Sequence, residues 1–169
     1  MKHQLKIIWV LICLPFMSLS QDRPDDSLRR IADTMRFKEP FIFSTRVKLS
    51  TSANKIYKSC EQWLQSVKDS LPAIDIKKDS LHKRIVATNI PASANISCQM
   101  VIVIQNNGYH ISLGQFIFHT INGQSIAVEK AVRMPAYKTS VNIERVLIVH
   151  NYSTIFQSLK DFLLYNNGS

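Results

Sequence analysis

Glycine and proline are scarce in this chain, with only 4 glycines and 6 prolines among its 169 residues. That scarcity argues against collagen-like, low-complexity and repeat proteins, and we find no internal repeat. Catalytic motifs are missing as well, because the sequence has no nucleophile elbow, no glycine-rich phosphate loop and no zinc-binding helix motif. We therefore expect a protein that is not an enzyme and carries no cofactor.

The histidines show no spacing that would suit a metal ion. His110 and His119 lie nine residues apart on one predicted strand, and an odd separation places two side chains on opposite faces of a regular strand. The pair Asp75 and Asp79 lies beside a predicted turn, where aspartate is common for structural reasons. We expect no metal site.

Long apolar runs are absent except near the N-terminus, where residues 7–17 follow the basic residues Lys2 and Lys6. A basic start, a short apolar segment and small residues before a cleavage point are typical of a secretory signal peptide. The sequence predicts a signal peptide over residues 1–20, cleaved between Ser20 and Gln21. We therefore expect an exported protein, periplasmic or at the cell surface.

Two alternatives to cleavage are less favoured. The apolar segment is shorter than the roughly 20 residues that a membrane-spanning helix needs, and Pro15 interrupts it, which argues against an uncleaved anchor. A lipoprotein signal at Cys13 would need a small residue before the cysteine, where Ile12 stands. We expect no transmembrane segment after cleavage.

Cysteines are few, and cleavage would leave only Cys60 and Cys98. Export permits a disulfide, and these two could form only one intramolecular bridge. Both fall at positions predicted to face the interior, Cys60 on a helix and Cys98 on a strand. A bridge requires Cα atoms within about 7 Å, and the alternative is a pair of small buried thiols that never bond.

Acidic residues are outnumbered, with 12 Asp and Glu against 21 Lys and Arg. Removal of Lys2 and Lys6 with the signal peptide lowers the formal net charge from +9 to +7. Such a balance favours anionic partners. Export makes an envelope component or an acidic protein the expected partner rather than nucleic acid; the alternative is that the charge only keeps the protein soluble.

The hydrophobic pattern predicts a single α+β domain over residues 41–166, preceded by a polar leader over residues 21–40. The expected order is β-α-β-β-β-β-α, a curved antiparallel sheet of about five strands with two helices packed on one face. Strands are predicted at 41–49, 74–77, 84–90, 96–105 and 109–119, and helices at 53–71 and 155–165. Residues 122–142 are predicted to form a long basic connection broken at Pro135, with a short edge strand at 125–128. Residues 143–149 suit either a strand or a helix.

Strict alternation along the strands places five side chains on the sheet face that points away from the helices. They are Arg46, Lys48, His110, Ser112 and Phe116. A face that combines basic, hydroxyl and aromatic groups is a candidate binding surface. The alternative is that the 122–142 connection covers Phe116 and that Arg46 and Lys48 are ordinary solvated residues.

The run from Ser52 to Leu64, with Tyr57 and Trp63 on a helix after an alternating strand, resembles a Bacteroidota family of exported proteins. That family is described as a domain of unknown function with a TATA-binding-protein-like fold. The resemblance covers about residues 41–119 and implies the fold. It implies no site residue, because none is established for the family, and the fold's association with DNA is analogy alone.

We expect an exported binding domain for an envelope component or a protein partner. The alternative is a helix-grip-like carrier, in which the last helix closes a cavity around a small apolar ligand. An enzyme acting on an envelope substrate is the third class, and it would require a cluster of titratable groups that the sequence does not reveal.

Overall fold

The computed structural model describes Arg30, Ile31 and residues 40–167 of the chain. The predicted signal peptide, its cleavage site between Ser20 and Gln21, and most of the predicted leader lie outside these residues. In the described part, no helix combines the length and the apolar character needed to cross a bilayer.

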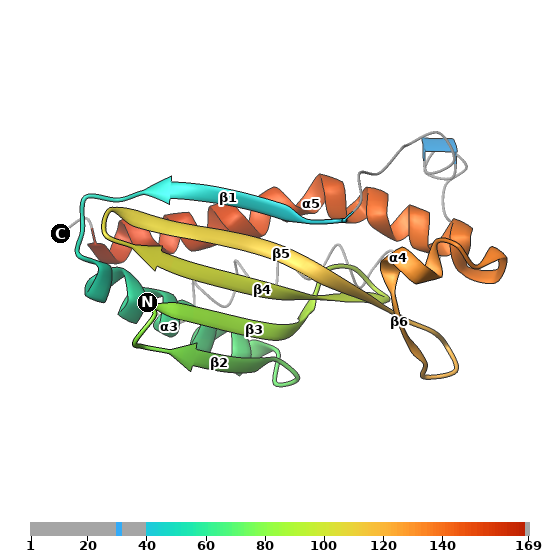
Figure 1. Cartoon of the computed structure of the whole chain (residues 1–169), viewed down its shortest axis with the longest axis horizontal. Coiled ribbons are helices and arrows are strands. Elements are labelled where there is room, and N and C mark those ends of the chain that lie inside the picture. The colour runs from blue at the N-terminus through green and yellow to red at the C-terminus, as the bar shows by residue number, and fades with distance from the viewer. Residues whose placement is uncertain (1–29, 32–39, 168–169) are drawn as a thin grey trace. The chain divides into compact units, whose positions relative to one another are not determined.

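The described elements follow one another as strands and helices of an α+β protein (Figure 1). Their bounds are β1 (Phe43–Lys48), α3 (Ala53–Ser70), β2 (Asp75–Asp79), β3 (Arg84–Pro91), β4 (Ile96–Gln105), β5 (Gly108–His119), β6 (Ser125–Ala127), α4 (Val128–Ala131) and α5 (Pro135–Asn167). The strands form one sheet in the order β1-β5-β4-β3-β2, and β6 pairs with β5. The predicted fold class is confirmed.

Helix α3 forms where the sequence predicts it, for local reasons. The hydroxyl of Ser52 caps the helix by accepting a hydrogen bond from the backbone N–H of Lys55, at 3.4 Å. Its apolar residues recur at helical spacing, and Ile56, Trp63 and Leu64 are almost completely buried. The helix ends at Ser70, two residues before Pro72.

The predicted long connection over residues 122–142 is wrong. Strand β6 confirms the short edge strand predicted at 125–128, helices α4 and α5 occupy most of the rest, and residues 143–149 are helical. Pro135 is the first residue of α5 and does not break the helix. The backbone N–H groups of the first helical turn make no hydrogen bond within the helix, so a proline, which lacks this group, is tolerated there. The C-terminal helix therefore begins twenty residues before the predicted Ile155.

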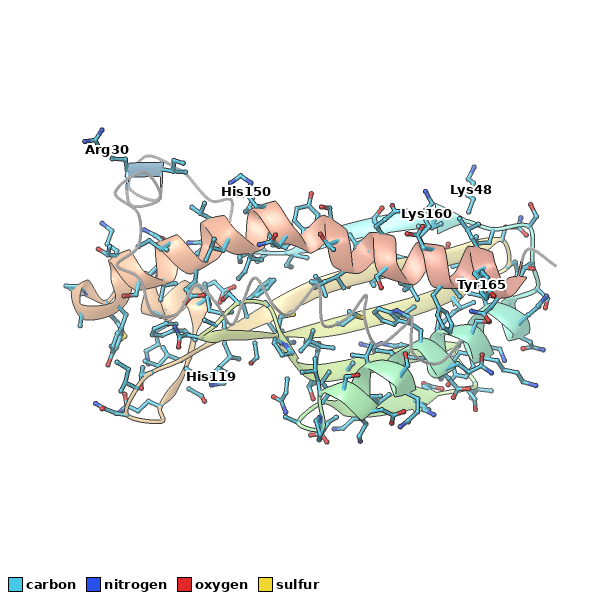
Figure 2. All side chains as sticks on the ribbon, turned by 180° about the vertical axis from the view of Figure 1, so that it is seen from behind. Arg30, Lys48, His119, His150, Lys160 and Tyr165 are labelled. Atoms are coloured by element: carbon cyan, nitrogen blue, oxygen red, sulfur yellow. The ribbon has the colours of Figure 1, made fainter. Side chains whose placement is uncertain are left out.

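The chain divides into two compact units. Among the described residues, unit 1 comprises Arg30, Ile31, residues 40–41, Pro91–Cys98 and Gln115–Tyr152, and unit 2 comprises Ile42–Ile90, Gln99–Gly114 and residues 153–167. In unit 2, α3 and the C-terminal part of α5 lie on the same face of the sheet (Figures 1 and 2). No helix of the described residues lies on the other face of that part of the sheet (Figure 1).

Aromatic and charged side chains pack together inside unit 1. The rings of Phe41 and Phe116 lie 4.9 Å apart between centroids, and the guanidinium of Arg145 lies 4.5 Å from the centroid of Phe41. Phe118 packs on Tyr137 at 5.6 Å. Cation–π and aromatic contacts of this kind each stabilise a fold by about 1 kcal/mol.

Two strands change which of their positions are buried. In β5, the buried residues are Tyr109, Ile111 and Leu113, and then Phe116 and Phe118. The shift from odd to even numbers occurs at Gln115, whose φ of 49° is in the left-handed region. Asn89, with a φ of 59°, interrupts β3 in the same manner. A residue in this conformation acts as a bulge, because it adds one residue to the strand and exchanges the faces of all that follow.

Candidate functional site

The pairing of β1 with β5 brings polar side chains together in unit 2. Ser44 is the register partner of Ser112, Arg46 of His110, and Lys48 of Gly108. We call Ser44, Arg46, Lys48, His110 and Ser112 the basic face. The three side chains of β1 are exposed, and the two of β5 are half-buried. Four of the five predicted site residues therefore meet on one surface, and their role in binding stays a prediction.

Phe116 does not belong to this surface, and its predicted place there is wrong. Its side chain is completely buried and packs on Phe41. The left-handed residue Gln115 exchanges the faces of β5, so Phe116 occupies a buried position whereas His110 and Ser112 do not. Strict alternation along the sequence could not reveal this shift.

Gly108 fixes the approach of β1 to β5. Its φ is 147°, and a Cβ atom built on it would lie 1.9 Å from the carbonyl oxygen of Val47. The backbone N–H of Leu49 donates to the carbonyl of Asn107 at 3.0 Å, which closes the end of the same ladder. Only glycine fits this close approach of two backbones, so Gly108 helps hold Arg46 beside His110.

Within the described residues, no side chain of the basic face makes a hydrogen bond or an ion pair to another residue. Strands β1 and β5 also contain no acidic residue. Arg46 and Lys48 are two residues apart on one strand and share a face, so their like charges repel each other weakly in water. An anion placed between them would relieve this repulsion.

Apolar side chains continue the same surface on the neighbouring strands. The two-residue turn between Gln105 and Gly108 sets the register of β4 against β5, which places Val103 beside His110 and Val101 beside Ser112. Val101 and Val103 are half-buried, as is Val86 on the next strand, β3. We call Val86, Val101 and Val103 the valine strip.

The far edge of this surface is charged. On β2, the exposed Lys77 is the register partner of Val86, and Asp79 is the partner of Arg84. The carboxylate of Asp79 accepts hydrogen bonds from the backbone N–H of His82 at 3.0 Å and contacts its imidazole at 2.7 Å. These hydrogen bonds lower the pKa of Asp79. Its negative charge is therefore already engaged in the turn.

A second polar group lies in unit 1, and the sequence did not predict it. His119, which is labelled in Figure 2, contacts the hydroxyl of Ser97 through Nε2 at 2.8 Å and that of Ser125 through Nδ1 at 3.1 Å. We call these three residues the hydroxyl–imidazole row. The prediction that His110 and His119 face opposite sides is wrong, because the shift at Gln115 cancels their odd separation and leaves both rings at the less buried positions.

Next to this row, a carboxylate is buried inside unit 1. The backbone N–H of His119 donates to the carbonyl of Asn95 at 2.8 Å, and the side-chain amide of Asn95 donates to Glu144 Oε1 at 2.8 Å. Glu144 is only 8% exposed, and its Oε2 has no hydrogen-bond partner among the described residues. The amide of Asn95 thus supplies part of the polar contact that a buried carboxylate needs.

The two cysteines of the described part are free and buried, so the disulfide left open by the sequence is not formed. Burial raises the pKa of Cys60 and of Cys98 to about 12. Both thiols are therefore protonated at neutral pH and unsuited to nucleophilic chemistry. Nor do the described residues contain a group of three or more His, Cys, Asp or Glu side chains that could hold a metal ion.

Two buried phenols also lack partners. The hydroxyls of Tyr57 and Tyr109 make no hydrogen bond to another described residue, and burial raises the pKa of both. The ammonium of Lys83 lies 5.4 Å from the centroid of the Tyr57 ring. Buried hydroxyls without partners are rare in native proteins, and a bound water or ligand often explains them.

Comparisons with known proteins identify the fold. No family model and no curated protein matches the sequence. A TBP-like protein from Parabacteroides distasonis is similar in structure, with a TM-score of 0.54 and 12% identity over 74% of this chain and 96% of that one. A DUF4468 family protein from Bacteroides ovatus gives a TM-score of 0.53 and 11% identity over 81% of this chain and 96% of that one. At these identities the likeness shows the fold alone, and it confirms that the chain has the TBP-like α+β fold found in Bacteroidetes proteins of unknown function.

Proposed function

We propose that this chain is an exported, non-enzymatic domain whose basic face binds an anionic component of the cell envelope. The observation that carries the proposal is the set of partnerless side chains on β1 and β5: two cations, an imidazole and two hydroxyls on neighbouring strands. Each can donate hydrogen bonds to an anion. The N-terminal signal-peptide pattern supports delivery of this surface to the envelope.

Binding fits the described groups better than catalysis does. The two thiols are protonated, and both nitrogens of His119 are already in contact with hydroxyls. The basic face, in contrast, presents two exposed cations beside hydrogen-bond donors, and no acidic side chain lies on β1 or β5. They suit recognition of negative charge.

Export and binding are tested in sequence. The full chain is expressed in a Gram-negative host, the secreted form is recovered from the periplasm, and its N-terminus is sequenced, with Gln21 expected first. The secreted protein is then incubated with envelope extract at low and at high salt. Retention at low salt and release at high salt are expected, because contacts between exposed charges are screened by salt.

The basic face is tested by a pair of double variants. Arg46→Gln with Lys48→Gln should reduce retention at least tenfold. Lys55→Gln with Lys58→Gln removes the same charge from exposed positions of α3 and should leave retention within about twofold. Equal losses in both variants would show that net charge alone drives retention, and the proposed site would then be wrong.

The carrier is the second candidate, and the partnerless hydroxyls of Tyr57 and Tyr109 favour it. A mostly apolar molecule with one polar group would supply the missing hydrogen-bond partner of a phenol. Native mass spectrometry of the secreted protein should then show an adduct that organic extraction removes. A single mass equal to that of the polypeptide would rule out a retained ligand.

A further inference from the structure

The basic face is continuous with the valine strip, and this continuity narrows the chemistry of the partner. Val103 lies beside His110, and Val101 lies beside Ser112, through the two-residue turn that joins β4 to β5. Val86 continues the strip on β3. The surface thus has an apolar centre next to a cationic margin, which is the usual layout of a protein–protein interface.

Charges of both signs lie beyond the strip, since Asp75 and Asp79 alternate with Lys77 on the same face of β2. Lys77 is the register partner of Val86, and Arg84 is exposed on the same strand as Val86. Neither makes an ion pair with a described residue. Five strands at about 4.8 Å spacing place β1 and β2 roughly 19 Å apart, which is wider than the 10–12 Å of a helix with its side chains. The surface between β1 and β2 is therefore wide enough to seat a helix or a strand on the valine strip, with Arg46 and Lys48 at its β1 margin.

Two kinds of anion would use this surface differently. A sulfated polysaccharide would pair with Arg46 and Lys48 but would bring no aliphatic group to the valines. A phosphate headgroup would do the same, because the acyl chains of its lipid stay in the bilayer. A polypeptide with carboxylates on either side of aliphatic side chains would do both. The planar guanidinium of Arg46 also suits a carboxylate, since the two groups can form paired hydrogen bonds.

We infer that the partner at this surface is an acidic protein segment, which lays aliphatic side chains on the valine strip while its carboxylates meet Arg46 and Lys48. This inference rests on the proposed function, because it uses the same basic face. It adds that the partner is a polypeptide and that Val101 and Val103 contribute to its affinity.

The experiment compares the binding of three probes to the secreted protein. Fluorescence anisotropy measures the peptides directly, and dextran sulfate is measured by its competition with a labelled peptide. One is a peptide of alternating glutamate and leucine, the second is a polyglutamate peptide of the same charge, and the third is dextran sulfate. The glutamate–leucine peptide should bind at least tenfold more tightly than polyglutamate. Dextran sulfate should compete only at low salt.

Two double variants separate the contributions of charge and of apolar contact. Val101→Thr with Val103→Thr keeps the branched shape and the charge. It should weaken binding of the glutamate–leucine peptide about tenfold and leave binding of polyglutamate and dextran sulfate unchanged. Arg46→Gln with Lys48→Gln should weaken the binding of all three probes. Val47→Thr, at a position of β1 that alternates away from the basic face, is the matched control and should change none.

The outcomes distinguish the inference from the proposed function. Equal binding of all probes, with no effect of the valine variant, would overturn the acidic-peptide partner and leave anion binding in place. Unchanged binding of the probes to the Arg46 and Lys48 double variant would overturn both the acidic-peptide partner and the proposed anion binding by the basic face. Circular dichroism of each variant establishes that a lost affinity is not a lost fold.

Discussion

The basic face of unit 2 and the hydroxyl–imidazole row of unit 1 are both built from polar side chains on neighbouring strands. They differ in whether these side chains make hydrogen bonds within the described structure. In the row, His119 contacts the hydroxyls of Ser97 and Ser125. On the basic face, Arg46 and His110 are register partners but have no side-chain partner among the described residues. Groups that satisfy one another support the fold, whereas groups left without partners remain available to a ligand.

The largest effect is expected from breaking the attachment of β1, on which the basic face depends. Gly108→Ala places a Cβ atom 1.9 Å from the carbonyl oxygen of Val47, at a φ of 147°. Backbone atoms on both sides must move, so we expect the free energy of unfolding to fall by about 3 kcal/mol or more. Urea denaturation measures the fall, and binding of dextran sulfate should weaken with it.

Gly123→Ala is the control for this prediction. Gly123 also has a positive φ, 78°, but a Cβ atom there would meet nothing within 4 Å. Its cost should be the left-handed conformation alone, about 1 kcal/mol. Equal costs at the two glycines would contradict the claim that Gly108 is required by the close approach of β1.

Charge reversal on the basic face should separate binding from stability. Arg46→Glu with Lys48→Glu should weaken binding of dextran sulfate about 100-fold at low salt, because two attractions become repulsions. The free energy of unfolding should change by less than about 0.5 kcal/mol, since neither side chain has a partner in the described structure. A large loss of stability would show that these cations support the fold instead.

A pair of histidine variants compares the two regions directly. His119→Ala removes both hydroxyl contacts of the row and should lower the free energy of unfolding by about 1 kcal/mol without affecting binding. His110→Ala should do the reverse, with weaker binding and almost unchanged stability. Thermal unfolding and anisotropy on the same samples provide the test, and identical behaviour of the two variants would remove the distinction.

The smallest effect is expected from reducing agents. Since Cys60 and Cys98 are free, dithiothreitol should leave the melting temperature of the secreted protein unchanged. Burial raises the pKa of both thiols to about 12, so a thiol reagent at pH 8 should label them only after unfolding. A drop in melting temperature on reduction would instead reveal a disulfide.

The features that the sequence predicted correctly depend on neighbouring residues. Ser52 caps α3, and an apolar stripe then repeats at helical spacing. The two-residue turn Asn106-Asn107 joins β4 to β5, and alternation along β1 exposes Arg46 and Lys48. Each signal lies within a few positions of the element that it specifies.

The features that it missed depend on backbone conformation or on distant partners. Pro135 begins α5, and proline is compatible with both a helix start and a break. Gln115 adopts a left-handed conformation although it is not a glycine. Strict alternation therefore assigned Phe116 to the wrong face of the sheet. The contact of Ser97 with His119 joins residues from two strands, and its geometry depends on that same shift.

The left-handed residue in β5 is the one position that this strand could lose without exchanging its faces. Buried positions are odd-numbered up to Leu113 and even-numbered from Phe116. Deletion of Gln115 would restore uniform alternation and would leave Phe116 and Phe118 on the buried face, because a bulge adds one residue to the strand. During divergence of this chain, a deletion at Gln115 should therefore survive more readily than a single deletion elsewhere in β5, which would exchange the faces of the residues between the deletion and Gln115.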